Sequence, residues 1–539
     1  MKQKILVIGL LFSILLSCRT VSSTSTMNSE DSNTTPLTPT PSHVPPVSQP
    51  EVAASSQPGG KIVWREIPPS ELFDLDWENN SLFLKGLKPK SKHWVADLPY
   101  ASRYRMELII PNEVQGLLGR QEVVYTNQEN VDLNEIIFRL FANINGGAIE
   151  VSNLRVNGKS VDPRLINENS TLAVSLNEPL APGESILIQM DFALQIPLEM
   201  GGNYGLFGYF SDVLMLDVFS PMIPAYDDQG WYSETPSKNG DLSYNDASFY
   251  LVRVIAPDDF VLVASGVEVD RETANGTQMV TYAVGPARDF SLVGSRNFIF
   301  DSDEENGVTV NSYGLPGMEE GMGLAKESAL AAIRIFDDRI GAYDYTEFDV
   351  VSTPMLAGGI EYPGMTWINM NSYDLSATKK GIPASSMLES VTVHETGHQW
   401  FYNAVGNDQS DMPWLDESLV QYITGLYFLD RYGTEGYEGY KSSWDSRWKN
   451  VDYQEIPIGL PSSKYTETEY SAVVYGRGPY FFEKLSDVMG EDAFGEFLRD
   501  YYSRYHWQIA ETEDLKRVTE QYCGCDLTGL FEDWVYQSE

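Results

Sequence analysis

The chain has 539 residues, of which 42% are hydrophobic and 12% aromatic. This length and composition predict a globular protein of two or three domains and exclude a disordered chain. The formal net charge of -40 excludes a nucleic-acid partner, because binding to phosphates needs clustered Lys and Arg side chains.

The first segment is typical of an export signal. Lys2 and Lys4 precede an apolar run over residues 5–16, which is too short to span a bilayer but suits a signal peptide. The run ends in Leu-Leu-Ser-Cys, which resembles the lipobox of bacterial lipoproteins. We therefore expect a cleaved signal peptide over residues 1–17 and a lipid anchor at Cys18. An ordinary signal peptide that is cut a few residues later is the alternative.

Residues 18–60 are predicted to form a tether. The segment is rich in Ser, Thr and Pro and has no aromatic residue, so it cannot bury a core of its own. A tether behind a lipid anchor predicts an exported protein at the bacterial cell surface or facing the periplasm. Its contact with the membrane would be through the lipid anchor only.

Residues 61–300 are predicted to form a β domain. Apolar and polar residues alternate from Ile186 to Phe192, and similar patterns occur in YRMELIIP, NEIIFRLFAN, SFYLVRVIAP and FVLVASGVEV. Turn signals of the Asn-Gly and Pro-Gly type separate these runs at residues 157–158, 182–183 and 275–276. This domain shows no chemical motif of its own.

The pattern becomes helical in residues 301–539, apart from the strand-like stretch EFDVVSTPM. A capping box at residues 386–389 is predicted to start a helix that runs through residues 391–400. A second helix is predicted from Pro413 to Gly433. Helical spacing returns from Tyr480 to Trp534, with a predicted core of Phe494, Phe497, Leu498, Tyr501 and Tyr502.

The stretch VTVHETGHQW holds His394, Glu395 and His398 in the order H-E-x-x-H. On a helix the two histidines lie one turn apart on the same face, so both imidazoles can bind one metal ion with Glu395 beside it. A catalytic zinc needs a third protein ligand and an open position for water. Glu417 is the candidate third ligand. It follows His398 after eighteen intervening residues and lies on the predicted second helix, in WLDESLVQY.

HETGHQWF, followed after this interval by WLDES, resembles the gluzincin pattern of the aminopeptidase N (membrane alanyl aminopeptidase) family of zinc metallopeptidases. The resemblance implies one Zn²⁺ per chain, held by His394, His398 and Glu417, with Glu395 as the catalytic base. It also implies an α+β fold, in which an antiparallel, saddle-like β domain precedes a thermolysin-like, mainly helical catalytic domain. The large C-terminal helical domain of the family is expected to be missing, because the chain stops soon after DLTGLFEDWV.

Upstream of the histidines, LAGGIEYPG resembles the exopeptidase motif of the same family, with Gly358, Gly359 and Glu361 in the matching positions. The resemblance implies that these residues bind substrate and that Glu361 binds the free α-ammonium group. A buried carboxylate that faces an ammonium excludes peptides without that charge. Ile360 and Tyr362 depart from the commonest form of the motif.

Downstream, YSAVVYGRGPYFF resembles the stretch around the family's tyrosine that stabilises the tetrahedral intermediate. Tyr475 occupies that position and is the second catalytic candidate. Tyr470 is interpreted as a wall residue of the cleft.

These segments together predict a zinc-dependent aminopeptidase that acts on peptides with a free N-terminus. The missing closing domain and the departures at Ile360 and Tyr362 leave a zinc endopeptidase on the same fold as an alternative. A non-catalytic surface binding lipoprotein is the other alternative, because the tether would permit it. The residues of the specificity pocket stay open, with residues 219–231 as a candidate segment.

Cys523 and Cys525 are the only cysteines besides Cys18. One intervening residue is unfavourable for a disulfide, and two thiols alone make a poor metal site. We expect no disulfide framework, while the oxidation state of this pair stays open.

Overall fold

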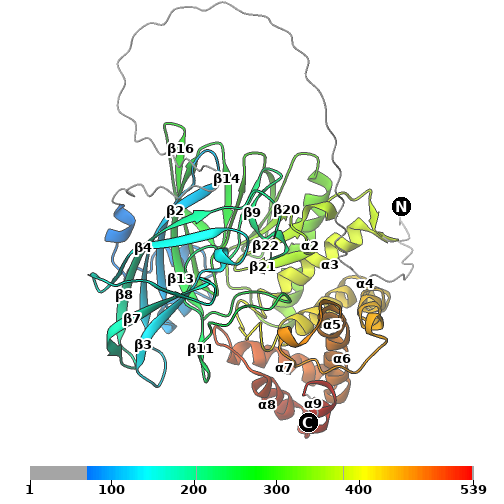
Figure 1. Cartoon of the computed structure of the whole chain (residues 1–539). Helices are drawn as coiled ribbons and strands as arrows, with labels where there is room; N and C mark the ends of the chain where they lie inside the picture. Colours follow the sequence, from blue (N-terminus) through cyan, green and yellow to red (C-terminus); the bar gives the residue numbers. More distant parts are fainter. Residues whose placement is uncertain (1–69, 202, 380, 537–539) are drawn as a thin grey trace, which may run out of the picture.

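The computed structural model describes residues 70–201, 203–379 and 381–536. Strands dominate up to residue 314 and helices dominate from residue 384, so the predicted α+β class is confirmed (Figure 1). The predicted signal peptide, the tether and Cys18 lie outside the described residues. None of the helices in the described ranges is long and apolar enough to cross a membrane.

The N-terminal part is built on one eight-stranded sheet. Its order is β15, β16, β13, β1, β2, β8, β4 and β5. The bounds in that order are Val267–Ala274, Thr277–Ala287, Ser248–Pro257, Arg103–Ile109, Gly116–Thr126, Ser185–Gln195, Ala148–Val156 and Lys159–Ser160. Neighbouring strands are antiparallel, as predicted, except that β1 pairs with β13 in parallel. Alternate residues of β8 are buried, as its apolar periodicity predicts.

Smaller sheets complete this part of the molecule. A four-stranded sheet has the order β14 (Val261–Ala264), β17 (Leu292–Ser295), β10 (Val213–Leu216) and β9 (Phe207–Phe210). A three-stranded sheet has the order β3 (Leu133–Arg139), β7 (Thr171–Leu180) and β6 (Arg164–Ile166). The hairpin β11 (Tyr226–Asp227) and β12 (Gly230–Trp231) lies beside the helical part. The predicted turn at residues 275–276 joins β15 to β16, with Gly276 at φ 77°.

A five-stranded sheet carries the transition to the helical part. Its order is β18 (Ile299–Glu305), β19 (Val308–Gly314), β20 (Glu347–Thr353), β22 (Met365–Asn369) and β21 (Gly359–Tyr362). The sheet begins at Ile299, next to the predicted boundary at residue 300, and that division of domains stays a prediction. Strand β21 lies at the sheet edge and contains Glu361.

Eight described helices follow or flank this sheet. They are α2 (Glu319–Arg339), α3 (Ala384–Gly397), α4 (Glu417–Trp448), α5 (Glu467–Ala472), α6 (Gly478–Met489), α7 (Glu491–Arg504), α8 (Thr512–Cys523) and α9 (Thr528–Trp534). The predicted core residues of α7 are all buried. In Figure 1, α2 and α3 lie beside the five-stranded sheet, and α5 to α9 gather below α4.

The predicted capping box at residues 386–389 is wrong. Helix α3 begins at Ala384, after the short strand β24 (Ile382–Pro383), and no side chain caps its first turn. Glu389 lies inside the helix and accepts hydrogen bonds from the hydroxyls of Tyr427 and Tyr432 on α4. The two tyrosines thus bind the Glu389 carboxylate, which the local sequence pattern had predicted to cap the start of the helix.

The second helix begins later than predicted. Pro413 lies in a turn, and α4 starts at Glu417 because the side chain of Asp416 accepts a hydrogen bond from its backbone N–H at 2.7 Å. The predicted end at Gly433 corresponds to a kink, where φ is 73° and ψ is -167°. Helical structure resumes beyond this glycine and continues to Trp448.

Cys523 and Cys525 form a disulfide, contrary to the unfavourable ring expected from one intervening residue. The intervening Gly524 ends α8 with φ at 63°, a conformation that glycine adopts without steric cost. The two Cα atoms are 5.1 Å apart as a result, which lies within the range for disulfides.

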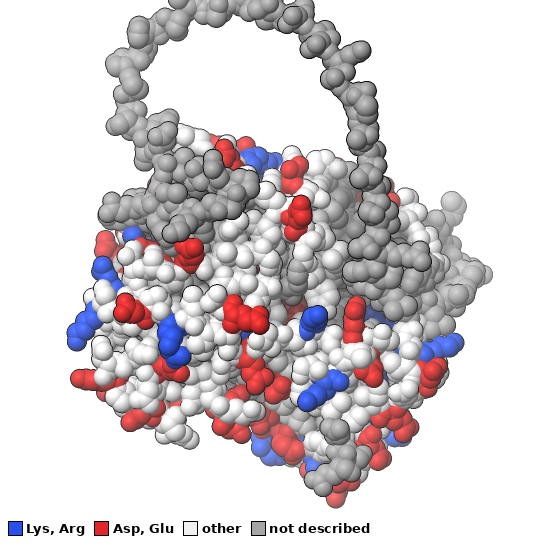
Figure 2. All heavy atoms as spheres, viewed as in Figure 1, with Lys and Arg blue, Asp and Glu red and all other residues white. Residues whose placement is uncertain are grey.

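The surface reflects the excess of acidic over basic residues, 77 against 37. Figure 2 shows Asp and Glu side chains scattered over the visible face, with Lys and Arg among them. The visible face therefore presents no basic patch in this view.

Candidate active site

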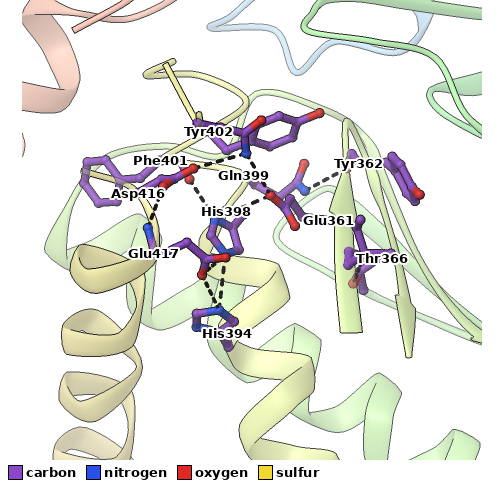
Figure 3. Close-up of polar contacts among 12 residues, drawn as sticks. Glu361, Tyr362, Thr366, His394, His398, Gln399, Phe401, Tyr402, Asp416 and Glu417 are labelled. Carbon is purple, nitrogen blue, oxygen red and sulfur yellow. Dashed lines mark hydrogen bonds and ion pairs between the residues drawn. The ribbon is translucent and has the colours of Figure 1, made fainter. Parts of the chain in front are cut away.

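The two predicted histidine ligands lie on the last turn of α3 and at its C-terminal cap. His394 and His398 are 7% and 1% exposed, and their Nε2 atoms are 3.3 Å apart. Glu417 is the first residue of α4, and its Oε2 lies 3.1 Å from Nε2 of His394 and 3.5 Å from Nε2 of His398. Figure 3 shows the three side chains pointing toward one another. The structure thus brings together all three predicted ligands.

This arrangement fits a tetrahedral metal. Zinc binds nitrogen and oxygen ligands at about 2.0–2.1 Å, so two ligands of a tetrahedral site are about 3.3 Å apart. The three donor separations of 3.1, 3.3 and 3.5 Å match this value. A water molecule would fill the fourth position, as in a catalytic rather than a structural zinc site.

Hydrogen bonds and burial set the state of each ligand. The carbonyl of Phe401 lies 3.1 Å from Nδ1 of His398, which leaves Nε2 of that ring as the metal-facing acceptor. Burial lowers the pKa of His394 to about 4, so its imidazole is neutral at pH 7. Burial opposes ionisation of Glu417, but its contacts with the rings of His394 and His398 hold the pKa of its carboxyl below the usual range.

Glu395 follows His394 on α3 and is 6% exposed. Its carboxylate packs against strand β21, where a Cβ atom added at Gly359 would lie 2.4 Å from Oε1 of Glu395. Burial, and after it the charge of Glu361, raises the pKa of Glu395 well above its ordinary value. A raised pKa makes the carboxylate a stronger proton acceptor, as a general base requires.

Glu361 lies on the other side of His398 from Glu417. Its Oε1 is 3.9 Å from Nδ1 of His398 and accepts a hydrogen bond from Nε2 of Gln409 at 3.4 Å. The side chain of Gln399 holds β21 beside α3, because it bonds to the backbone of Tyr362 and Gly364 at 2.9 Å each. Gly358 lies one residue before the strand, where a Cβ atom would make only an ordinary contact with Val391 at 3.7 Å.

Tyr475 lies on a π-helical turn, Val473–Arg477, between α5 and α6. Such turns are frequent at functional sites. Its hydroxyl donates a hydrogen bond to Oε1 of Glu417, so it reaches the metal ligands. Burial, and after it the charge of Glu417, raises the pKa of Tyr475 well above its ordinary value, which keeps the proton on the hydroxyl.

Tyr470 lines the same region, with its ring 5.8 Å from that of Tyr475. This position agrees with its interpretation as a wall residue.

Sequence reasoning missed several acidic residues near this site. Asp416 lies in the stretch WLDES directly before Glu417, and its Oδ2 accepts a hydrogen bond from Gln409 at 3.2 Å. Asp217, Asp241 and Asp289 line a cavity next to Glu361 and belong to no local motif. Residues 219–231, the candidate pocket segment, do not line this cavity; residues 217–218 and 241–243 on either side of them do.

A model of the peptidase family M1 domain matches residues 324–534, which include Glu361, both histidines, Glu417 and Tyr475. Residues 324–534 are therefore similar to the M1 peptidase domain. The zinc ligands assigned from geometry therefore lie in the segment that this family model covers.

Relatives of known name are similar over a larger part of the chain. Aminopeptidase 2 of Candida albicans is 22% identical over 474 residues, which cover 83% of this chain and 50% of the relative. The alanine/arginine aminopeptidase of Saccharomyces cerevisiae is 24% identical over 291 residues, which cover 52% of this chain and 34% of the relative. The chain thus spans half or less of the length of these curated relatives.

Solved structures share the fold. The M1 zinc metallopeptidase of Deinococcus radiodurans superposes with a TM-score of 0.60 at 21% identity, covering 85% of this chain and 95% of that one. A mutant of the D. radiodurans enzyme bound to the peptide Tyr-Ser-Ala gives a TM-score of 0.59. The strand-rich and helical parts of the chain therefore share the fold of this M1 zinc metallopeptidase, and one zinc ion fits the three ligands.

Proposed function

We propose that the chain is a zinc-dependent aminopeptidase that removes the N-terminal residue from peptides. The observation that carries this proposal is the position of Glu361. Its carboxylate lies 3.9 Å from the ring of the metal ligand His398, on a strand that also packs against Glu395. An ammonium group held by Glu361 would place the first peptide bond, and no later bond, beside the metal ligands.

The metal ligands and Glu395 have separate roles in the proposed reaction. A zinc ion held by His394, His398 and Glu417 would supply a Lewis acid that activates water and polarises the scissile carbonyl. Glu395 accepts the proton of the attacking water and delivers it to the nitrogen of the leaving amine. The C–N bond breaks as the amine takes this proton, and the products are a free amino acid and a shortened peptide.

Two further residues of this chain act on the substrate. The hydroxyl of Tyr475 donates a hydrogen bond to the oxygen that gains negative charge, and one such donor contributes about 3 kcal/mol in comparable sites. Glu361 pairs with the α-ammonium group and orients the substrate. Gly359 leaves the room that Glu395 needs beside this strand.

The test uses one peptide in two forms, with its N-terminus free or acetylated, and zinc-loaded protein. We expect removal of the first residue from the free form only, identified by the masses of the products. A Glu395→Gln variant with unchanged zinc content should lose this activity, and full activity in that variant would refute the assignment.

The alternative of an endopeptidase has a distinct outcome in the same experiment. Ile360 and Tyr362, the departures from the commonest motif, flank Glu361 on β21. Internal cleavage of both peptide forms would replace the aminopeptidase by an endopeptidase on the same fold.

We also propose that the protein is an exported lipoprotein attached through Cys18. The apolar run and the Leu-Leu-Ser-Cys sequence support this proposal. Radiolabelled fatty acid should be incorporated into the chain during production in bacteria, and a Cys18→Ser variant should take up none. Equal labelling of both would exclude Cys18 as the anchor.

A further inference from the structure

The turn that carries Tyr475 is fixed to helix α4 on one side. We call this turn, residues 473–477, the π turn. Ser418 directly follows the metal ligand Glu417, and its hydroxyl donates a hydrogen bond to the carbonyl of Val474 at 2.6 Å. This bond links the π turn to the start of the helix that supplies Glu417.

The side chain of Arg477 fixes the π turn on its other side. It is 2% exposed. Its Nη1 donates hydrogen bonds to the carbonyl oxygens of Ile456 at 3.0 Å and Trp534 at 2.8 Å, and its Nη2 donates one to that of Asp533 at 3.0 Å. The guanidinium also lies 4.3 Å from the centroid of the Trp534 ring. One side chain therefore joins the π turn to the end of helix α9.

Arg477 is a buried cation that is bound by a helix end. Asp533 and Trp534 are the last two residues of α9, so their carbonyl oxygens lie at the negative end of the helix dipole. Burial lowers the pKa of Arg477 to about 10, which leaves the guanidinium positively charged at pH 7. A buried charge is costly unless hydrogen bonds and opposite charge replace the lost water. The end of α9 supplies both, and it thereby favours one position of the arginine.

Tyr475 and Arg477 lie two residues apart on the π turn but bind different partners. The hydroxyl of Tyr475 donates a hydrogen bond to Glu417, and the centroid of its ring is 6.1 Å from that of His394. Arg477 binds α9 instead. A displacement of the turn would therefore move the Tyr475 hydroxyl relative to the metal ligands. A shift of about 1 Å can lower a rate about 10²-fold, so the attachment to α9 affects the proposed reaction.

We propose that Arg477 is a positioning residue for Tyr475, because it holds the π turn against the carbonyl oxygens at the end of α9. This inference rests on the proposed aminopeptidase function. Arg477 binds protein groups and acts on the reaction only through the tyrosine. A purely structural role would lower the stability of the whole chain, whereas a positioning role requires the Tyr475 hydroxyl.

The test measures kcat and KM for alanine 4-nitroanilide with the zinc-loaded full chain. Arg477→Lys keeps the positive charge, but its single terminal nitrogen cannot bond to the three carbonyls in the geometry of a guanidinium. We expect kcat to fall about tenfold and KM to change less than about twofold, because the hydroxyl acts on the charge that develops in the transition state.

A double-mutant cycle shows whether Arg477 acts through Tyr475. In a Tyr475→Phe background no hydroxyl is left to position, so Arg477→Lys should lower kcat less than about twofold. Trp534→Leu is a second variant, which removes the ring beside the guanidinium and keeps the backbone carbonyls. It should likewise lower kcat only when the Tyr475 hydroxyl is present. Equal losses with and without this hydroxyl would overturn the inference.

Arg139→Lys is the matched control, because Arg139 is a buried arginine of strand β3 that also binds backbone carbonyls. It is 0% exposed, and its Nη1 and Nη2 donate hydrogen bonds to the carbonyl oxygens of Tyr232 at 3.1 Å and Glu234 at 2.7 Å. Burial lowers its pKa to about 10 as well. Arg139→Lys should lower Tm but leave kcat unchanged at temperatures where the chain is folded. A loss of kcat equal to that in Arg477→Lys would overturn the inference.

A spectroscopic measurement separates this inference from the proposed function. 3-Fluorotyrosine incorporated at position 475 of the zinc-loaded chain reports on the surroundings of this ring by ¹⁹F NMR. Arg477→Lys should shift or broaden the resonance, and Arg139→Lys should leave it unchanged. If no anilide or peptide is cleaved but the resonance responds in this way, Arg477 positions Tyr475 and the proposed activity is wrong. If substrate is cleaved and neither kcat nor the resonance responds to Arg477→Lys, the activity is correct and the positioning role is wrong.

Discussion

Gly359 on strand β21 lies directly against the carboxylate of Glu395 on helix α3, so that a methyl group at position 359 would lie 2.4 Å from Oε1. A contact this short forces either the strand or the carboxylate to move. Gly359→Ala should therefore lower kcat/KM by about 10²-fold, the loss expected when a catalytic group is displaced by about 1 Å. Steady-state kinetics at fixed zinc content would measure this effect.

Gly358→Ala is the control for this prediction. A Cβ atom there would lie 3.7 Å from the nearest side chain, which is ordinary van der Waals contact. Gly358→Ala should therefore lower kcat/KM much less than Gly359→Ala. Equal losses in both variants would show that the clash with Glu395 is not the cause.

Removal of the Tyr475 hydroxyl should affect the rate more than binding. Tyr475→Phe is expected to lower kcat about 10²- to 10³-fold with a smaller change in KM, because the hydroxyl bonds to the charge that develops during the reaction. Zinc content should stay at one per chain. Tyr480→Phe, on the next turn along α6, should keep the activity, and a comparable loss there would point to general damage of this region.

Zinc should stabilise the fold as well as support activity. The ligands His394, His398 and Glu417 are all buried, and they belong to two different helices. A thousandfold excess of metal over its Kd contributes about 4 kcal/mol, which corresponds to a rise in Tm of about 4 °C for a chain of this length. Differential scanning calorimetry before and after chelation would measure the shift.

Glu417→Ala should reduce this zinc-dependent shift, because it removes one of the three ligands. Glu438→Ala provides the matched control at an exposed position of the same helix. A shift that survives in Glu417→Ala would mean that zinc binds elsewhere.

The stability of the protein should fall between about pH 4 and pH 7 because of Asp289. Its pKa is about 7 in the folded chain, against 3.8 for a free aspartate, so the folded state binds the proton more tightly than the unfolded state. A folded pKa that is raised gives a free energy of unfolding that decreases as the pH rises through this range. The two pKa values correspond to at most about 4 kcal/mol.

Asp289→Asn should therefore be more stable than the unmodified chain at pH 8, and the difference should shrink toward pH 4. Urea unfolding at both pH values would measure it, with the exposed Glu272→Gln as control. If Asp289→Asn differed from the unmodified chain by the same free energy of unfolding at both pH values, protonation of Asp289 would not be the cause.

The metal ligands could be predicted from the sequence because helical geometry alone brings His394 and His398 together. Glu417 followed from the short interval between two predicted helices. The cavity next to Glu361 could not be predicted in this way. Asp217, Asp241 and Asp289 come from three separate connections of the β part, and only tertiary folding places them next to Glu361.

The errors at helix starts have a similar cause. Glu389 matched a local capping pattern, but the hydroxyls of Tyr427 and Tyr432, about forty residues later, bind it instead. The α+β class and most strands were predictable, since alternation of apolar residues depends only on which face of a sheet is buried. The pairing of strands that are distant in sequence was not predictable, as the parallel pairing of β1 with β13 shows.

The parallel pair of β1 and β13 has a consequence for biosynthesis. About 140 residues lie between the two strands, so at a synthesis rate of about 5–20 residues per second β1 waits on the order of 10 s for this partner. Strand β2 follows within a few residues and can cover one side of β1 early. The other edge of β1, along Arg103–Ile109, stays unpaired in the nascent chain until β13 is made. We expect this edge to be the site where a nascent chain most readily pairs with a strand of another chain.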